Sequence, residues 1–295
     1  MRVSDTQFNN VMLNGMAESK KKLTTLMEQL HAAEKLTKIS DDPVASVKLL
    51  GLEKTLNETT QYITNIESIK SEYQRYETQI SSIESNLQDA NALILLAKNN
   101  TADSSSFVIE LESLKENFIA TFNSKDNYGA YLFAGTASNE VPFIKDVATG
   151  EWAVNPNINS DTSEAVVGEG LKLTNNFTLD DVDAKDILDF MSTTIIQLNS
   201  ANPDMDAVGK AHDQLLNSLG NVSASHAKLG SGINNMDRLQ ETHIDTELFA
   251  TKLEGDLKNL NFDEAAVKVD SYSLALQVSQ KTFIKLSGLS MFKLM

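Results

Sequence analysis

The sequence predicts a mainly α fold: an elongated antiparallel helical bundle or coiled coil, with a small β-rich tip module and terminal helices that are mobile in the monomer. Three observations indicate this class. Two long segments carry apolar residues at heptad spacing, a short stretch between them is interrupted by glycines, and both chain ends are apolar at helical spacing. An apolar residue at every third or fourth position is typical of a helix with one buried face.

The first long helix is expected from about Pro43 to about Asn99. Asp41 and Asp42 offer capping oxygens before Pro43, which suits the first turn of a helix. Ordering a backbone costs about 1–2 kcal/mol per residue, so an uncovered apolar stripe would leave this helix marginal. It therefore needs a helical partner. Its predicted core residues are Ile66, Ile69, Tyr73, Tyr76, Ile80, Ile83, Leu87 and Ile94.

The partner helix is expected in the C-terminal third of the chain, where apolar residues recur every seven positions. Two shorter helices, Phe107 to Phe122 and Ile187 to Leu198, fill out the bundle. Residues 43–138 and 184–260 are thus interpreted as one helical rod domain. The C-terminal contribution to its core is Leu215, Val222, Leu229 and Met236.

Residues 139–183 are expected to form a small β-rich outer domain. Short apolar runs alternate with turn formers, among them Gly168-Glu169-Gly170. That turn lacks the third glycine of a dinucleotide-binding loop. The acidic run 180–186 lacks the central glycine and the closing glutamate of a calcium loop, so we expect helix capping ahead of Ile187.

The chain ends, residues 1–42 and 261–295, are expected to be assembly helices that are disordered in the monomer. No acidic residue follows Asp270, and the tail is basic and amphipathic. It could be a terminal helix of the core, a membrane-surface helix, or a segment that orders only against neighbouring subunits. A matching apolar pattern at the N-terminus favours the third. The predicted assembly residues are Val3, Phe8, Val11, Met12, Leu23, Leu26, Leu30, Tyr272, Leu276, Phe283, Leu286, Leu289 and Phe292.

Composition argues against several kinds of chemistry. A formal net charge of −16 argues against nucleic acid as a partner, and the absence of cysteine excludes thiolate metal sites and cysteine nucleophiles. His226 and His243 lie on or beside the heptad stripe, so we expect polar positions that fix register and no metal ligand or catalytic base. The sequence therefore predicts no enzyme, no catalytic, cofactor or metal site, no cofactor and no small-molecule substrate.

Three stretches resemble the conserved ends of the bacterial flagellin superfamily: Arg2–Gln7, Gln29–Ala45 with its Asp-Asp-Pro, and Leu274–Lys281. The stretch Tyr131–Thr136 resembles the hook-filament junction branch of that superfamily more than flagellin. One departure is local: where the family usually has Ser-Gly-Lys-Arg before Asp-Asp-Pro, this chain has Ala32–Lys35.

The resemblance implies a structural component of the flagellum, which joins hook to filament by self-assembly through terminal coiled coils. It implies an extracellular location, reached through the flagellar secretion system without a cleaved signal peptide. The implied partners are copies of the chain in a ring or helical lattice, the first hook-associated protein, flagellin and a cytosolic flagellar export chaperone. Two alternatives stay open: flagellin itself as the filament subunit, and a secreted coiled-coil adhesin or translocator.

Overall fold

The computed structural model describes residues 2–99, 105–146 and 150–292. In this part of the chain the fold is mainly α with two small antiparallel sheets, as predicted. None of the described helices combines the length and apolar character needed to cross a bilayer. The elements are α1 (Arg2–Ala32), α2 (Pro43–Asn99), α3 (Ser105–Phe122), β1 (Phe143–Lys145), β2 (Trp152–Val154), β3 (Glu164–Gly168), β4 (Leu171–Thr174), η1 (Asp180–Val182), α4 (Ala184–Leu198), α5 (Met205–Lys258) and α6 (Phe262–Phe292).

The chain divides into two compact units. Unit 1 comprises Met1–Glu58 and Thr246–Met295, and unit 2 comprises Thr59–Asp245. The sequence of unit 1 holds 14 basic and 14 acidic side chains, so its formal charge is zero. Unit 2 holds 11 basic and 27 acidic side chains. The whole net charge of −16 therefore belongs to unit 2.

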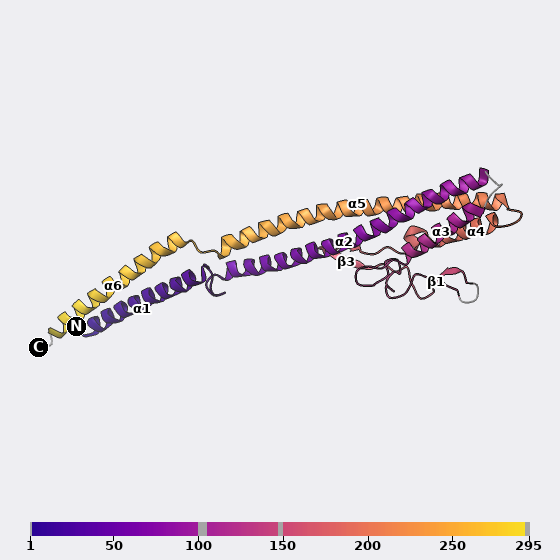
Figure 1. Cartoon of the computed structure of the whole chain (residues 1–295). Coiled ribbons are helices and arrows are strands. Elements are labelled where there is room, and N and C mark those ends of the chain that lie inside the picture. Colours follow the sequence, from indigo (N-terminus) through magenta and orange to yellow (C-terminus); the bar gives the residue numbers. More distant parts are fainter. Residues whose placement is uncertain (1, 100–104, 147–149, 293–295) are drawn as a thin grey trace. The chain divides into compact units, whose positions relative to one another are not determined.

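The core of unit 2 forms between α2 and α5, which run antiparallel, with α3 and α4 packed beside them (Figure 1). Every predicted rod-core residue is buried except Tyr73, which is half-buried, and Ile66, Ile69 and Met236 lie in a second, smaller cluster. The shorter helices add large side chains to the same core, including Leu111, Phe118, Phe122, Ile187, Phe190 and Met191. Burying one such side chain contributes about 1.5–3 kcal/mol, so this four-helix core supplies the covering that the α2 stripe needs.

Polar pairs also link α2 to α5. Glu84 accepts hydrogen bonds from Ser223 (2.6 Å) and from Nδ1 of His226 (2.8 Å), and His212 bonds through Nε2 to the side-chain oxygen of Asn91 (2.8 Å). The bond from Ser223, and next that from His226, lower the pKa of Glu84 below its ordinary value. These bonds have defined partners only in one alignment of the two helices, so they fix the register.

Each small sheet is a single antiparallel hairpin, β1 with β2 and β3 with β4. In the second hairpin the residues alternate: Val167 is buried and Ala165 and Leu173 are half-buried, while Glu164 and Lys172 are exposed and form an ion pair of 3.5 Å. This alternation is typical of a hairpin with one face on a core. Gly168-Glu169-Gly170 forms the turn, as predicted.

The hairpin β3–β4 is fastened to α2 and α5 through its own backbone carbonyls. Asn65 donates to Val166 (2.7 Å), Tyr73 donates its hydroxyl hydrogen to Thr174 (2.8 Å), and His243 donates from Nε2 to Val167 (2.7 Å). The β-rich insert thus lies along the flank of the α2–α5 pair. Val167 completes a small apolar cluster there with Ile66, Ile69 and Met236.

The predicted capping role of the acidic run 180–186 is wrong in its detail. Asp183 occupies the N-cap position of α4 but makes no side-chain cap, and its carboxylate accepts a hydrogen bond from Asn221 (2.7 Å). The reason lies in the backbone of Asp183, which has φ 50° and ψ 33° in the left-handed region, whereas a residue whose side chain caps a helix is typically extended. The η1 turn leads directly into α4 through this residue, and the N–H of Ala184 donates to the Leu179 carbonyl (3.0 Å).

Candidate assembly site

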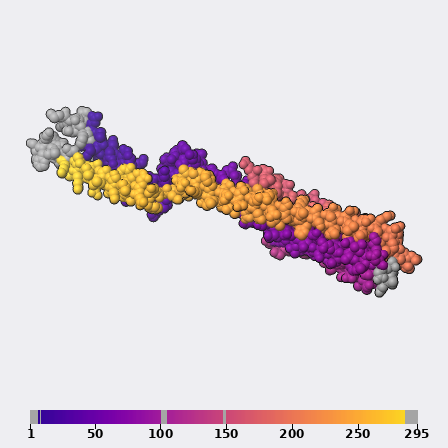
Figure 2. Space-filling model, turned by 90° about the horizontal axis from the view of Figure 1, so that it is seen from above, coloured from indigo at the N-terminus to yellow at the C-terminus, as the bar shows by residue number. Residues whose placement is uncertain are grey.

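The terminal helices α1 and α6 lie side by side and antiparallel within unit 1 (Figures 1 and 2). Leu26 of α1 and Ala265 of α6 are buried in this unit. Of the predicted assembly residues, Met12, Leu23, Leu30, Tyr272, Leu276 and Phe283 are half-buried, and Val11 is exposed. The side chains of Val3, Phe8, Leu286, Leu289 and Phe292 lie outside the described residues. That the two ends are mobile in the free subunit stays a prediction.

Helix α6 carries apolar residues on two opposite faces. At about 100° per residue, Tyr272, Leu276 and Phe283 fall on one face, which is half-buried. Val267, Leu274 and Val278 fall on the opposite face and are 69%, 62% and 54% exposed. One α1–α6 pair therefore covers one apolar face of α6 and leaves the other free for a further helix.

The two helix breaks of unit 1 lie next to each other. The N–H of Lys35, between α1 and α2, donates to the carbonyl of Lys258 at the end of α5 (2.8 Å). The N–H of Leu260, between α5 and α6, donates to the carbonyl of Ala33 (3.2 Å). The side chains of Glu34 and Lys258 add an ion pair of 3.3 Å. Backbone bonds thus tie the two linkers of the terminal pair together.

The linker between α1 and α2 contains the local departure from the family pattern, and its backbone there is strained. Ala33 has a φ of 60°, in the left-handed region that favours glycine, and it stands where the family usually has glycine. Further along, Asp42 accepts backbone hydrogen bonds from Val44 (3.1 Å) and Ala45 (3.0 Å). Asp42 is therefore the N-cap of α2, as predicted, and Pro43 is the first helical residue.

The histidines take part in packing. His226 bonds to a carboxylate between α2 and α5, and His243 bonds to the backbone of β3, so both lie at half-buried polar contacts between elements. Burial, with a smaller effect of Lys98, lowers the pKa of His212 below its ordinary value. Among the residues that the structure describes, no three His, Asp or Glu side chains are placed to hold a metal ion.

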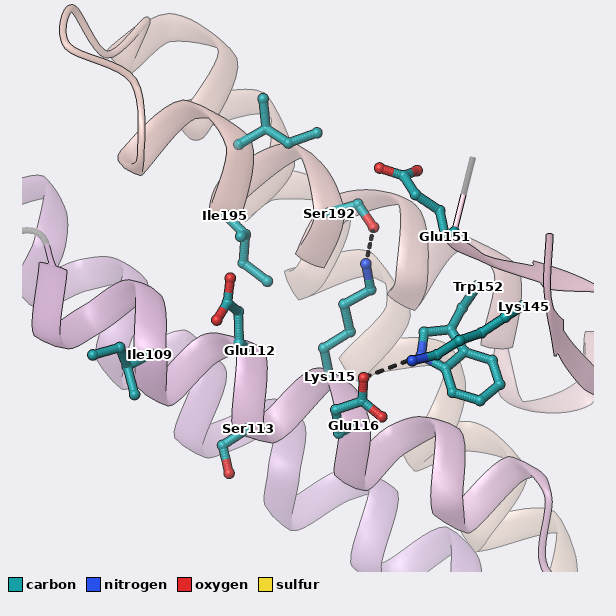
Figure 3. A pocket seen from close by; sticks show the side chains of 12 residues that line it. Ile109, Glu112, Ser113, Lys115, Glu116, Lys145, Glu151, Trp152, Ser192 and Ile195 are labelled. Carbon is teal, nitrogen blue, oxygen red and sulfur yellow. Dashed lines mark hydrogen bonds between the residues drawn. The ribbon is translucent and has the colours of Figure 1, made fainter. Parts of the chain in front are cut away.

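A groove of about 550 Å³ in unit 2 runs between α3, α4 and β2 (Figure 3). Lys115 of α3 donates to the Ser192 hydroxyl of α4 (2.8 Å), and the Trp152 indole N–H of β2 donates to Glu116 of α3 (3.1 Å). The Lys145 ammonium lies 4.9 Å from the centre of the Trp152 ring. These polar groups bond to one another across the seam, so they hold the β1–β2 hairpin on the helices.

Paired terminal helices, a helical core and a flanking β-rich insert define a helical structural subunit. No protein-family model matches the chain. It is, however, 25% identical over its full length to flagellar hook-associated protein 3 from Salmonella typhimurium and 24% identical to that of Escherichia coli, and each match covers 99% of the relative. A Vibrio parahaemolyticus structure, described as a flagellar hook-associated protein, is 27% identical with a TM-score of 0.66, and the match covers 74% of this chain and 100% of that chain. The resemblance to flagellar hook-associated protein 3 is therefore confirmed.

Proposed function

We propose that this chain is a structural subunit of the bacterial flagellum that joins the hook to the filament by self-assembly through its terminal helices. The observation that carries the proposal is the exposed apolar face of α6, formed by Val267, Leu274 and Val278. Such a face is typical of a surface that a further helix covers. The full-length similarity to flagellar hook-associated protein 3 supports the same function.

Assembly would proceed by head-to-tail contacts between copies. In such contacts one subunit offers a different surface from the one it receives, so copies follow a ring or a helical lattice instead of closing as a dimer. Covering the free face of α6 gains about 1.5–3 kcal/mol for each fully buried Val or Leu. That gain offsets the cost of ordering the ends, which we expect to be mobile in the free subunit.

The proposal extends to partners and to location. The neighbours would be the first hook-associated protein on the hook side and flagellin on the filament side, with a cytosolic chaperone that holds the subunit before export. Export would use the flagellar secretion system without cleavage of a signal peptide, and the mature location would be extracellular. Copy number separates this function from that of flagellin, because a junction ring contains few copies and a filament contains many.

A matched pair of substitutions on α6 tests the assembly function. Leu274→Ser changes the exposed face, so the free subunit should keep its helix content and thermal stability but fail to enter flagella. Leu276→Ser changes the half-buried face two residues away, so it should weaken the α1–α6 pair in the free subunit. Circular dichroism and electron microscopy of flagella, in a strain without its own copy of the gene, measure both effects. Flagella built normally with Leu274→Ser would contradict the proposal.

Removal of residues 271–295 gives a second test. The shortened chain should stay soluble and helical, because unit 2 keeps its complete core, but it should not join hook to filament. Amide exchange on the intact free subunit examines the mobility of its ends directly. Normal swimming by the truncated variant would argue against assembly through the terminal helices.

A further inference from the structure

The two outer edges of the β1–β2 hairpin end differently. Asn123, which directly follows α3, accepts the N–H of Phe143 through its side-chain oxygen (2.8 Å) and donates from Nδ2 to the Phe143 carbonyl (3.0 Å). One side-chain amide thus bonds to the outer edge of β1 as a further strand would. These bonds also show that the N–H and C=O groups of Phe143 point away from β2.

The outer edge of β2 has no such partner. Val154 lies opposite Phe143, and Trp152 lies opposite Lys145. Two residues that face each other in an antiparallel ladder either exchange both hydrogen bonds or direct their groups outward. Because the groups of Phe143 point outward, so do those of Val154 and, two residues earlier, those of Trp152. Among the residues that the structure describes, none bonds to these four backbone groups.

This free edge runs beside a cavity of about 490 Å³. The cavity is lined on one side by α4 and on the other by the five consecutive residues 152–156. The side chains of a strand alternate between its two faces, so contact with every successive residue indicates that the cavity meets the backbone at the edge of the strand. Phe143 and Leu188 add buried apolar surface. An incoming strand therefore finds both a backbone edge and an apolar floor.

The cavity adjoins the groove shown in Figure 3, because Trp152 lines both. We refer to the two together as the α4 groove. The residues of α4 that line it recur at helical spacing on one face: Lys185, Leu188, Asp189, Ser192, Ile195 and Ile196. This face is about 16 Å long at ~1.5 Å per residue, a length that an extended chain covers with about five residues. Ile196 and Ile109, at the end away from Leu188, are 56% and 69% exposed.

We propose that the α4 groove binds an extended, basic peptide segment of another protein, which adds to the edge of β2 as a third strand. Main-chain hydrogen bonds to Trp152 and Val154 would hold the segment, and apolar side chains at alternate positions would fill the groove. Charge selects a basic partner, because five carboxylates and three lysines line the groove and unit 2 as a whole carries −16. The same charge disfavours a second copy of unit 2 as the occupant. This inference goes beyond the assembly function and does not depend on it.

Fluorescence of the intact free subunit measures binding directly, because Trp152, the single tryptophan, lies in the α4 groove. The probe is a synthetic peptide of about seven alternating Lys and Val residues, long enough to span the groove. It should change the emission of Trp152 saturably, and a peptide with Glu in place of Lys should bind about tenfold more weakly. Absence of saturable binding up to about 1 mM of the Lys–Val peptide, or equal binding of the two peptides, would overturn the inference.

Two N-methylated forms of the Lys–Val peptide test strand addition itself. Methyl groups on alternate nitrogens remove the N–H donors along one edge of the extended chain and leave its charge and side chains unchanged. One form is methylated on the Val residues and the other on the Lys residues, so only one of them loses the donors that face β2. That form should bind about tenfold more weakly than the other. Equal binding of the two forms would contradict strand addition.

A matched pair of charge reversals locates the site on the protein. Asp189→Lys changes an exposed carboxylate of the groove and should weaken binding of the Lys–Val peptide about tenfold. Asp213→Lys makes the same charge change at an exposed position of α5 outside the lining of the groove, and it should bind nearly as the natural chain does. Equal losses would mean that the overall charge of unit 2 holds the peptide, which would overturn the inference. These measurements involve no flagella, so the proposed function stands or falls separately.

Discussion

Substitution of Gly135 by alanine should destabilise unit 2 through two separable effects. Gly135 belongs to the stretch Tyr131–Thr136 and has a φ of +66°. A Cβ added there would lie 2.9 Å from the carbonyl carbon of Asn159 and closer still to its oxygen, whereas a Cβ essentially never comes within 3.0 Å of a heavy atom outside its own residue and chain neighbours. The side-chain oxygen of Asn159 also accepts the N–H of Thr136 (2.9 Å). The backbone around Asn159 must therefore shift.

The size of the loss follows from these two effects. A left-handed backbone costs an L-residue about 1–2 kcal/mol, and the smaller freedom of alanine in the unfolded chain returns about 0.4–1 kcal/mol. Displacing Asn159 and weakening its hydrogen bonds adds about 1–3 kcal/mol. We expect a total near 3 kcal/mol for Gly135→Ala. Gly170→Ala is the matched control, because Gly170 has a φ of +68° but no heavy atom within 4 Å of its added Cβ, and it should lose only about 1 kcal/mol.

Urea unfolding followed by the fluorescence of Trp152, the single tryptophan, measures both variants in unit 2. The midpoint for Gly135→Ala should fall clearly below that for Gly170→Ala, with similar slopes. Equal losses of stability in the two variants would mean that the backbone around Asn159 shifts at no cost in free energy. That result would refute the reasoning from the close approach of the added Cβ to Asn159.

Ala33→Gly should stabilise the α1–α2 linker by about 0.5–1 kcal/mol, which thermal unfolding of unit 1 measures, and a loss would contradict the left-handed backbone assigned there. Glu84→Gln should destabilise unit 2 by about 1–2 kcal/mol at neutral pH, since it weakens the bonds to Ser223 and His226. Because the pKa of Glu84 is lowered in the folded chain, its contribution is complete above the ordinary value of 4.5 and is lost as the pH falls through the folded value, so the difference between the variant and the natural chain should shrink in acid. Lys in place of exposed Asp161 or Glu164 should leave assembly unchanged, and reduced incorporation into flagella would count against an outward position.

The sequence was informative where a feature depends on neighbours in the chain. The bounds of α2 follow from Asp42 and Pro43 at its start and from an unbroken heptad pattern, and these are local signals. The partner helix α5 could be inferred because a long apolar stripe needs a second one. The turn at Gly170 could likewise be read from two glycines around one residue.

Contacts between distant segments could not be read in the same way. Tyr73 and His243 bond to the hairpin β3–β4, whose acceptor residues lie 101 and 76 positions away in the sequence. No residue near either side chain in the sequence indicates these hydrogen bonds, because tertiary packing decides them. The capping role expected of the acidic run 180–186 was wrong for the same reason, since neither the η1 turn nor the left-handed backbone of Asp183 is indicated by the neighbouring residues. The predicted assembly residues of α6 did not include Val267, Leu274 and Val278, although their spacing already indicated an apolar face opposite Tyr272.

The unequal distribution of charge between the two units has a consequence for the medium in which the protein works. A contact between two neutral units brings no net charge together, although each added copy carries −16 on its acidic unit. Copies of the acidic unit repel each other over a range set by dissolved salt, about 8 Å at 0.15 M but about 30 Å at 0.01 M. Fresh water should therefore weaken contacts between the acidic units and leave contacts between the neutral units largely unaffected. The salt of sea water should screen the repulsion between the acidic units.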